Sequence, residues 1–277
     1  MAENEWVTGT IRVSIAGHPL EMSMTVPAKP IKPHRMLPVF HQMTNSFVGL
    51  SVEAAKAEGE AVSCKAGCGA CCRQPVPLAE VEVYQLAELV EAMPEPKKSE
   101  IKERFAASAE HFRKIGWFDR VGRFSELART EPEETVAEEV KNAVHQYMDE
   151  RIPCPFLEEE SCTIHESRPI ACREYLVTSP AENCYDPTAA TVKKVDMIME
   201  PSKILKHLGT TGSFANAGLL PLVRALELAD KVPEHFVEKT GERWVADFFG
   251  IMTRSEIPKK GIKAKPKSNR KPRKKRR

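Results

Sequence analysis

The placement of the cysteines constrains this chain more than any other feature of its sequence. All eight fall in two groups of four, with 81 residues between the groups: Cys64, Cys68, Cys71 and Cys72, then Cys154, Cys162, Cys172 and Cys184. Buried structural cysteines usually occur singly on apolar faces, whereas these lie in polar, turn-rich sequence. The two groups therefore indicate a chemical role for the thiols.

The expected compartment helps to choose among those roles. The opening MAENEWVTGT lacks the basic and apolar parts of a secretory signal, and no run of 18 apolar residues predicts a membrane-spanning helix. We therefore expect a cytoplasmic protein that does not enter the membrane, with reduced thiols. That favours metal binding or catalysis over disulfides, which remain an alternative for an exported protein. Cys68-Gly-Ala-Cys71 has the spacing of a thiol redox site but lacks the βαβ context.

The short gaps in the first group suit metal ligation. A chain must reverse within two or three residues to aim two sulfurs at one metal, and Gly67 and Gly69 permit positive φ on either side of Cys68. The adjacent pair Cys71-Cys72 is different, because neighbouring side chains diverge. Either the pair serves two metals, or one member lies beside the metal rather than on it.

The wide gaps of the second group favour an iron–sulfur cluster over zinc. Structural zinc usually takes two close cysteine pairs, but the second group is spread by 7, 9 and 11 residues. A cluster is larger than an ion, and Cys154-Pro155 is similar to the Cys-Pro of bacterial ferredoxins. Zinc remains the alternative. The spacing of Cys64, Cys68 and Cys71 also matches radical S-adenosylmethionine enzymes, but charged helices follow it instead of a β/α barrel.

The hydrophobic pattern predicts a mainly helical α+β fold. Strict alternation over residues 10–27 predicts a β-hairpin that turns at 16–19. Helical spacing predicts a long helix from about 36 to 58, ended by Gly59, that leads into the first cysteine group. Further helices are expected at about 79–93, 101–115, 136–151, 201–208, 216–230 and 241–253. A short alternation over 195–199 predicts one more strand, which we place beside the hairpin.

The predicted organisation has three parts. Residues 1–30 form the N-terminal hairpin, 31–255 form a helical domain whose helices are joined by two cysteine-rich metal-binding loops, and 256–277 form a disordered basic tail. Residues 259–277 carry 12 of the 41 Lys and Arg and no acid, leaving 29 bases against 39 acids in the rest. Such a tail predicts weak association with nucleic acid, or alternatively contact with the acidic body or a role in solubility.

Two stretches carry a resemblance to a known family. CKAGCGACC (64–72), followed by PVPLAEVEV, and CPFLEEESCTIHESRPIACREY (154–175) resemble the YkgJ-type cysteine-cluster family, also described as a zinc- or iron-chelating domain, over about 60–185. The resemblance implies that Arg168, Pro169 and Arg173 surround the site. The arginines would offset thiolate charge, or alternatively pair with nearby glutamates. The family usually has Tyr where this chain has His165, which is either a nitrogen ligand or a surface side chain.

Three classes of function follow. In the first, the eight cysteines bind an iron–sulfur cluster, or zinc, in a structural or sensory module. In the second, the protein is a cluster-dependent enzyme: the family includes the flagellin lysine N-methylase, so the resemblance permits methyl transfer to protein lysines with S-adenosylmethionine. The sequence shows no glycine-rich methyltransferase loop. In the third, a nucleic-acid-associated factor keeps a structural metal. A protein partner or substrate is expected without being identified.

Overall fold

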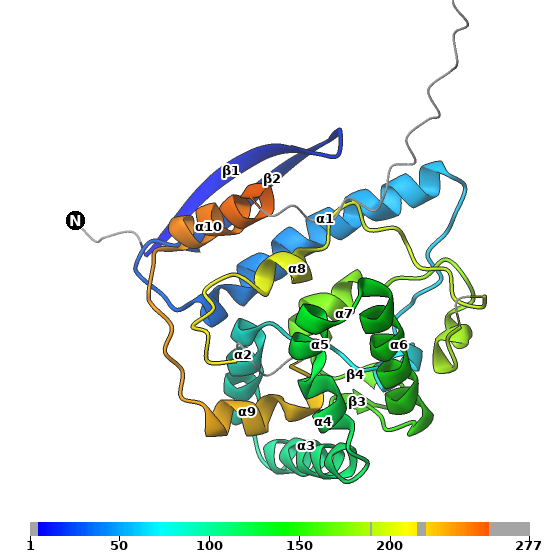
Figure 1. Cartoon of the computed structure of the whole chain (residues 1–277). Helices are drawn as coiled ribbons and strands as arrows, with labels where there is room; N and C mark the ends of the chain where they lie inside the picture. Colours follow the sequence, from blue (N-terminus) through cyan, green and yellow to red (C-terminus); the bar gives the residue numbers. More distant parts are fainter. Residues whose placement is uncertain (1–4, 189, 215–219, 255–277) are drawn as a thin grey trace, which may run out of the picture.

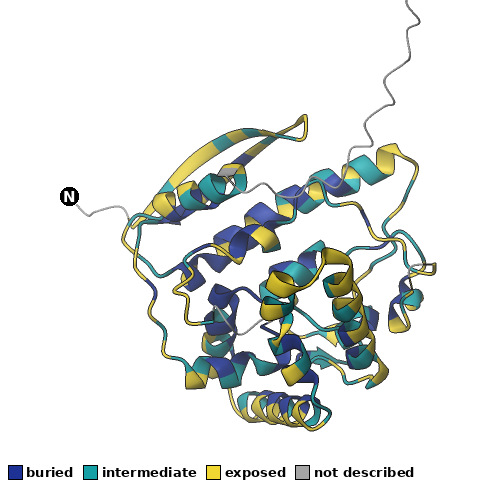
Figure 2. Cartoon of the chain, viewed as in Figure 1, coloured by how far each residue is buried: buried dark blue, intermediate teal, exposed yellow. Residues whose placement is uncertain are grey.

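A long antiparallel hairpin opens the chain in the computed structural model, which describes residues 5–188, 190–214 and 220–254. Strands β1 (Trp6–Ile15) and β2 (His18–Pro27) pair from Trp6↔Pro27 to Ile15↔His18. Ala16 and Gly17 both have positive φ, as a two-residue type I′ turn requires. The predicted hairpin is confirmed and is longer than expected. Its inner face buries Met22, Met24 and Val26, and its outer face is largely exposed (Figure 2).

Helix α1 (Leu37–Ala57) is the central element beneath the hairpin (Figure 1). Phe40 on α1 stacks on Phe248 of α10 (Gly241–Arg254), with ring centroids 5.6 Å apart. Gly59, at φ 82°, ends α1, with its N–H bonded to the Lys56 carbonyl and the Glu60 N–H to the Ala55 carbonyl. These are the two hydrogen bonds of a Schellman cap. The predicted helix and its stop are confirmed, and the cap turns the chain toward the first cysteines.

Most of the remaining helices pack around two further apolar clusters, whereas Ile170, Ile204 and Leu205 join the cluster beneath the hairpin. The remaining helices are α2 (Glu80–Glu91), α3 (Lys97–Lys114), α4 (Trp117–Gly122), α5 (Phe124–Thr130), α6 (Glu133–Asp149), α7 (Ile170–Glu174), α8 (Pro201–Leu205) and α9 (Ala225–Lys231). One cluster joins α2, α3 and α9, and the other joins α3, α4 and α6, where Phe112 stacks on Tyr147 at 4.0 Å. The fold is a mainly helical α+β structure, as predicted. The predicted residues 216–219 and 256–277 lie outside the described chain.

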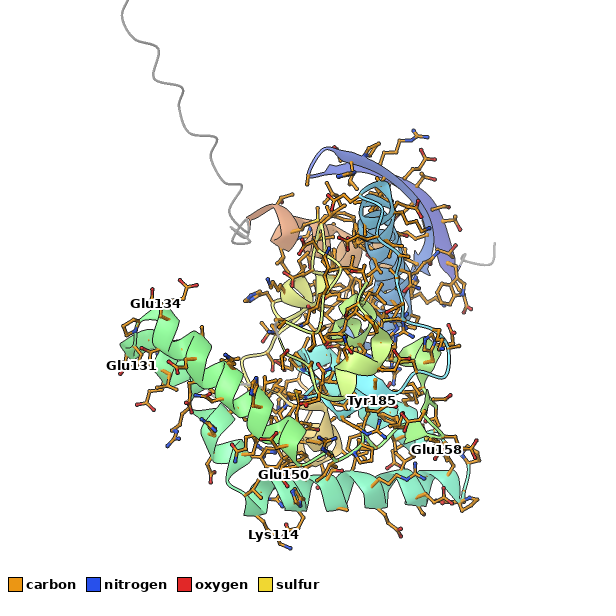
Figure 3. The ribbon with its side chains drawn as sticks, turned by 90° about the vertical axis from the view of Figure 1, so that its right-hand side faces the viewer. Lys114, Glu131, Glu134, Glu150, Glu158 and Tyr185 are labelled. Carbon is orange, nitrogen blue, oxygen red and sulfur yellow. The ribbon has the colours of Figure 1, made fainter. Side chains whose placement is uncertain are left out.

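Helix α6 extends outward from this body. Figure 3 shows Glu131 and Glu134 near its outer end, whereas Glu150 lies at its inner end beside α3. Tyr147, near that inner end, is buried, and most of the outer half is exposed. The Glu150 carboxylate meets His111 of α3 at 2.6 Å. The inner end of α6 therefore anchors the chain just before the second cysteine group.

The predicted strand at 195–199 is wrong. Within the described residues this segment forms no strand with the hairpin. The Val195 N–H instead bonds to the Leu176 carbonyl at 2.9 Å, and Val177 and Lys194 form an isolated bridge. The alternation arises because Val195 and Met199 are buried from an irregular segment that runs past the second cysteine group. No described helix has the length and apolar character needed to cross a membrane.

Candidate metal centre

The first cysteine segment is a tight turn. Gly67 takes φ 76°, as predicted, and a 3-10 turn over Ala70–Arg73 carries Cys71 and Cys72. The Cys72 N–H closes this turn on the Gly69 carbonyl at 2.9 Å. Gly69 does not use the positive φ that a glycine permits, because its φ is −94°. Gly69 is needed for another reason: an added Cβ would lie 2.7 Å from the Leu157 side chain and 3.0 Å from the Glu160 carbonyl oxygen.

The second cysteine segment packs directly on the first. The Cys154 N–H bonds to the Cys72 carbonyl at 2.7 Å. Beyond it, β3 (Leu157–Glu158) and β4 (Ser161–Cys162) form a minimal hairpin. Its turn residues Glu159 and Glu160 both have positive φ, which is unfavourable for a residue with a Cβ. Arg73 offsets this cost by a two-pronged ion pair with Glu160, at 3.0 and 2.6 Å.

The last two cysteines lie in short helical turns whose neighbouring residues contact the first cysteine segment. Cys172 lies on α7, and Cys184 lies in a 3-10 turn over Ala181–Tyr185. The Gln74 side-chain amide donates to the Tyr175 hydroxyl at 3.2 Å and to the Cys184 carbonyl at 3.4 Å. The Ser63 N–H, next to Cys64, bonds to the Val177 carbonyl at 3.0 Å. Tyr185, labelled in Figure 3, donates to Glu160 at 2.8 Å and so closes this turn onto the hairpin.

All eight cysteines line one cavity of about 1400 Å³. Each is a free thiol, so no disulfide forms among them in the described chain. Among the described residues, no three thiols, imidazoles or carboxylates converge closely enough to hold one ion. The structure thus brings together the two groups that the sequence separates by 81 residues. Their sulfurs are spread around a volume instead of meeting at a point.

Burial makes these thiols poor acids. It is the main cause that raises the pKa of Cys64, Cys162 and Cys184, and it raises the pKa of Cys154 to about 12. The pKa of Cys172 is raised further, also by burial. For Cys71 the first cause of a raised pKa is a hydrogen bond with the Cys72 thiol. Metal binding must therefore displace protons, and the metal's positive charge is what makes this favourable.

Arg168 supplies positive charge inside the cavity. Its side chain lines the cavity, and its Nε is buried with no hydrogen-bond partner among the described residues. Its charge also opposes the rise in pKa of Cys71 and of Cys162. A buried donor with no acceptor is costly, and a thiolate or a cluster sulfide is the acceptor that this position suits. The donor set and its surroundings therefore fit a thiolate-bound metal group.

The other predicted residues of the site surround have different places. Arg173 is buried and donates to the Arg168 carbonyl at 3.2 Å, to Asn45 Oδ1 of α1 at 3.0 Å and to the Glu166 carbonyl. It orders the loop that carries Arg168. Pro169 precedes the first residue of α7. His165 lines the cavity, but its side chain is 62% exposed and lies 3.6 Å from a Glu166 oxygen.

Sequence reasoning missed Arg73, Gln74 and Tyr175, which join the segments. Arg73 directly follows the vicinal cysteines, and Tyr175 ends the stretch quoted for the resemblance, so proximity to cysteine was the available signal. Their partners lie 87 and 101 residues away in the sequence. No local pattern reveals pairings at that distance.

Comparison with known families agrees with this geometry. Residues 63–194 match the model of the CxxCxxCC family, described as "Putative zinc- or iron-chelating domain". The matched range contains every cysteine of the chain. Searches of the curated proteins and of the solved structures found no match. Over that region the chain is similar to this cysteine-cluster family, and the cavity gathers the thiols that such a chelating domain would use.

Proposed function

We propose that the protein binds iron as an iron–sulfur cluster, held by its cysteines. The observation that carries the proposal is that all eight free thiols line one cavity. Thiolate is the ligand shared by zinc and iron–sulfur groups, so this observation alone supports a metal without choosing which. The choice between zinc and an iron–sulfur cluster rests on the spacing of the thiols and on the residues around the cavity.

Two features favour a cluster over a single zinc ion. Zinc draws four ligands tightly around one point, but no three ligands in the described residues converge in that way. A cluster keeps its own iron and sulfide atoms between the cysteine sulfurs, so wider spacing suits it. The buried Nε of Arg168 adds a donor of the kind that hydrogen-bonds to cluster or cysteine sulfur.

The chain's own residues would hold such a group and shield it. The cysteines provide the ligands, Arg168 offsets negative charge, and Ala70 and Val177 line the cysteines with apolar surface. When bound, a cluster would supply electron transfer or a purely structural link. The link would join the turn after α1 to the segment after α6, so metal binding would stabilise the fold.

Anaerobic purification tests this proposal. Iron, acid-labile sulfide and zinc are measured per chain, together with the visible absorption spectrum. We expect iron and sulfide in equal amounts and broad visible absorption. A colourless protein with stoichiometric zinc would overturn the iron–sulfur proposal. Thermal unfolding before and after metal removal, with Cys68→Ser as a second test, should show a lower melting temperature without metal. An unchanged melting temperature would contradict the structural link.

A further inference from the structure

The cysteines divide in space differently from the way they divide in sequence. Cys184, the last of the second sequence group, packs with Cys64, Cys68 and Cys71 around buried Ala70 and Val177. Cys154 and Cys162 instead pack against a separate apolar cluster that contains Phe156, Ile164 and Leu222. Cys184 therefore belongs to the second group in sequence but lies with the first group in space.

The electrostatic neighbours of Cys184 and of Cys172 place these two thiols in different sets, whereas Cys71 is also a neighbour of Cys154 and Cys162. The main thiol neighbours of Cys184 are Cys71, Cys64 and Cys68. Those of Cys172 are Cys154, Cys71 and Cys162. Cys71 appears in both sets, so it lies at the boundary between them. The backbone explains the exchange, because the Val177 carbonyl accepts the Ser63 N–H and so brings the chain before Cys184 beside Cys64.

The vicinal pair stands at this boundary. The Cys71 thiol packs with the first spatial group and is hydrogen-bonded to the Cys72 thiol. The Cys72 carbonyl accepts the Cys154 N–H at 2.7 Å, which holds Cys72 beside the second group. Arg168 acts on Cys71 of one group and on Cys162 of the other. Its charge would reduce the repulsion between two neighbouring sets of thiolates.

We infer that the cavity holds two adjacent metal centres, one on Cys64, Cys68, Cys71 and Cys184, and the other on Cys72, Cys154, Cys162 and Cys172. Each set has four thiols, the number that an iron–sulfur cluster or a structural zinc ion takes. The adjacent Cys71 and Cys72 then each serve a different centre. The inference rests on the proposed function that these thiols bind metal, but it does not depend on which metal they bind.

Metal counting on the fully loaded wild-type protein tests the number of centres. Two centres require about two zinc ions, or about eight irons if both are four-iron clusters, per chain. About one zinc per chain in fully loaded protein would overturn the inference, as would about four irons that Mössbauer spectra assign to one four-iron cluster instead of two two-iron clusters. Two zinc ions per chain would support two centres but contradict the iron–sulfur proposal. The metal count therefore tests the number of centres and the identity of the metal separately.

Cysteine variants test the assignment of ligands. Cys184→Ser and Cys172→Ser should each retain about half of the wild-type metal, and the double variant should retain none. Ser23→Ala, an exposed position on β2 that does not line the cavity, is the matched control and should bind metal like wild type. If one cysteine variant loses all metal and the other loses none, a single centre is present and the inference is wrong. Circular dichroism identifies a variant that has failed to fold, and the wild-type count still decides the number of centres.

Discussion

Gly69→Ala tests whether the second cysteine segment rests directly on the backbone of the first. The added Cβ would lie 2.7 Å from Leu157 Cδ1, 2.7 Å from Glu160 Oε2 and 3.0 Å from the Glu160 carbonyl oxygen. Ordinary contacts are about 3.5–4.0 Å, so the two side-chain atoms must move by roughly 0.8 Å and the backbone of the β3–β4 hairpin by roughly 0.5 Å. That shift disturbs the ion pair between Arg73 and Glu160 and displaces Cys162. We expect a loss of about 1–3 kcal/mol in the free energy of unfolding, typical of an overpacked site.

The assay is thermal unfolding combined with metal analysis. A loss of that size lowers the melting temperature by roughly 2–4 °C per kcal/mol in a domain of this size, and the metal content should fall with it. Gly49→Ala is the control, because Gly49 is an exposed position on α1 where a Cβ meets nothing within 4 Å. It should stabilise the protein by about 0.5–1 kcal/mol. If Gly69→Ala behaves like Gly49→Ala and keeps its metal, the close packing of the two segments is refuted.

Three further predictions concern charge and ligation. Arg168→Gln should weaken metal binding about 10-fold or more, measured by competition with a chelator. Arg12→Gln, on the exposed hairpin, is the control and should not change the affinity for metal. If both variants bind metal with the same affinity, Arg168 does not have the role given to it. Burial raises the pKa of Glu82 to about 7 from an ordinary 4.5, so the folded state holds this proton more tightly than the unfolded chain. The contribution of Glu82 to stability should therefore be fully present below about pH 4.5 and fall by up to about 3 kcal/mol as the pH rises to 7. In urea unfolding at pH 5 and pH 8, Glu82→Gln should lose less stability than wild type, and equal losses would contradict the assignment. His165→Ala should keep the wild-type metal content, since its side chain is largely exposed; a variant with less metal would make His165 a ligand.

The elements that local sequence determines were predicted well. The hairpin follows from strict alternation, and α1 follows from helical spacing and a glycine stop, because both patterns act over a few residues. The short helices α4 and α5 were not predicted. They are six and seven residues long, too short to form without tertiary support. Trp117 supplies part of that support by donating its indole N–H to the Ala143 carbonyl of α6 at 2.7 Å.

The site was predictable as a set of cysteines but not as an arrangement. Spacing and resemblance selected all eight thiols, and the structure places them on one cavity. Which thiols are neighbours depends on long-range contacts such as Ser63 with Val177, which span 114 residues. Gly69 illustrates the same limit. A glycine at this position permits a positive φ, but its role is to let the β3–β4 hairpin approach, a constraint set by residues 88 or more positions away.

X-ray absorption at the metal edge of the anaerobically purified protein tests the central claim most directly, because it reports the ligand atoms. If the cysteine cavity holds the metal, the first shell consists of sulfur at about 2.3 Å. An iron–sulfur cluster adds a second shell from neighbouring irons. A first shell of nitrogen and oxygen at about 2.0–2.2 Å, with no sulfur, would contradict the assignment of the cysteines as ligands.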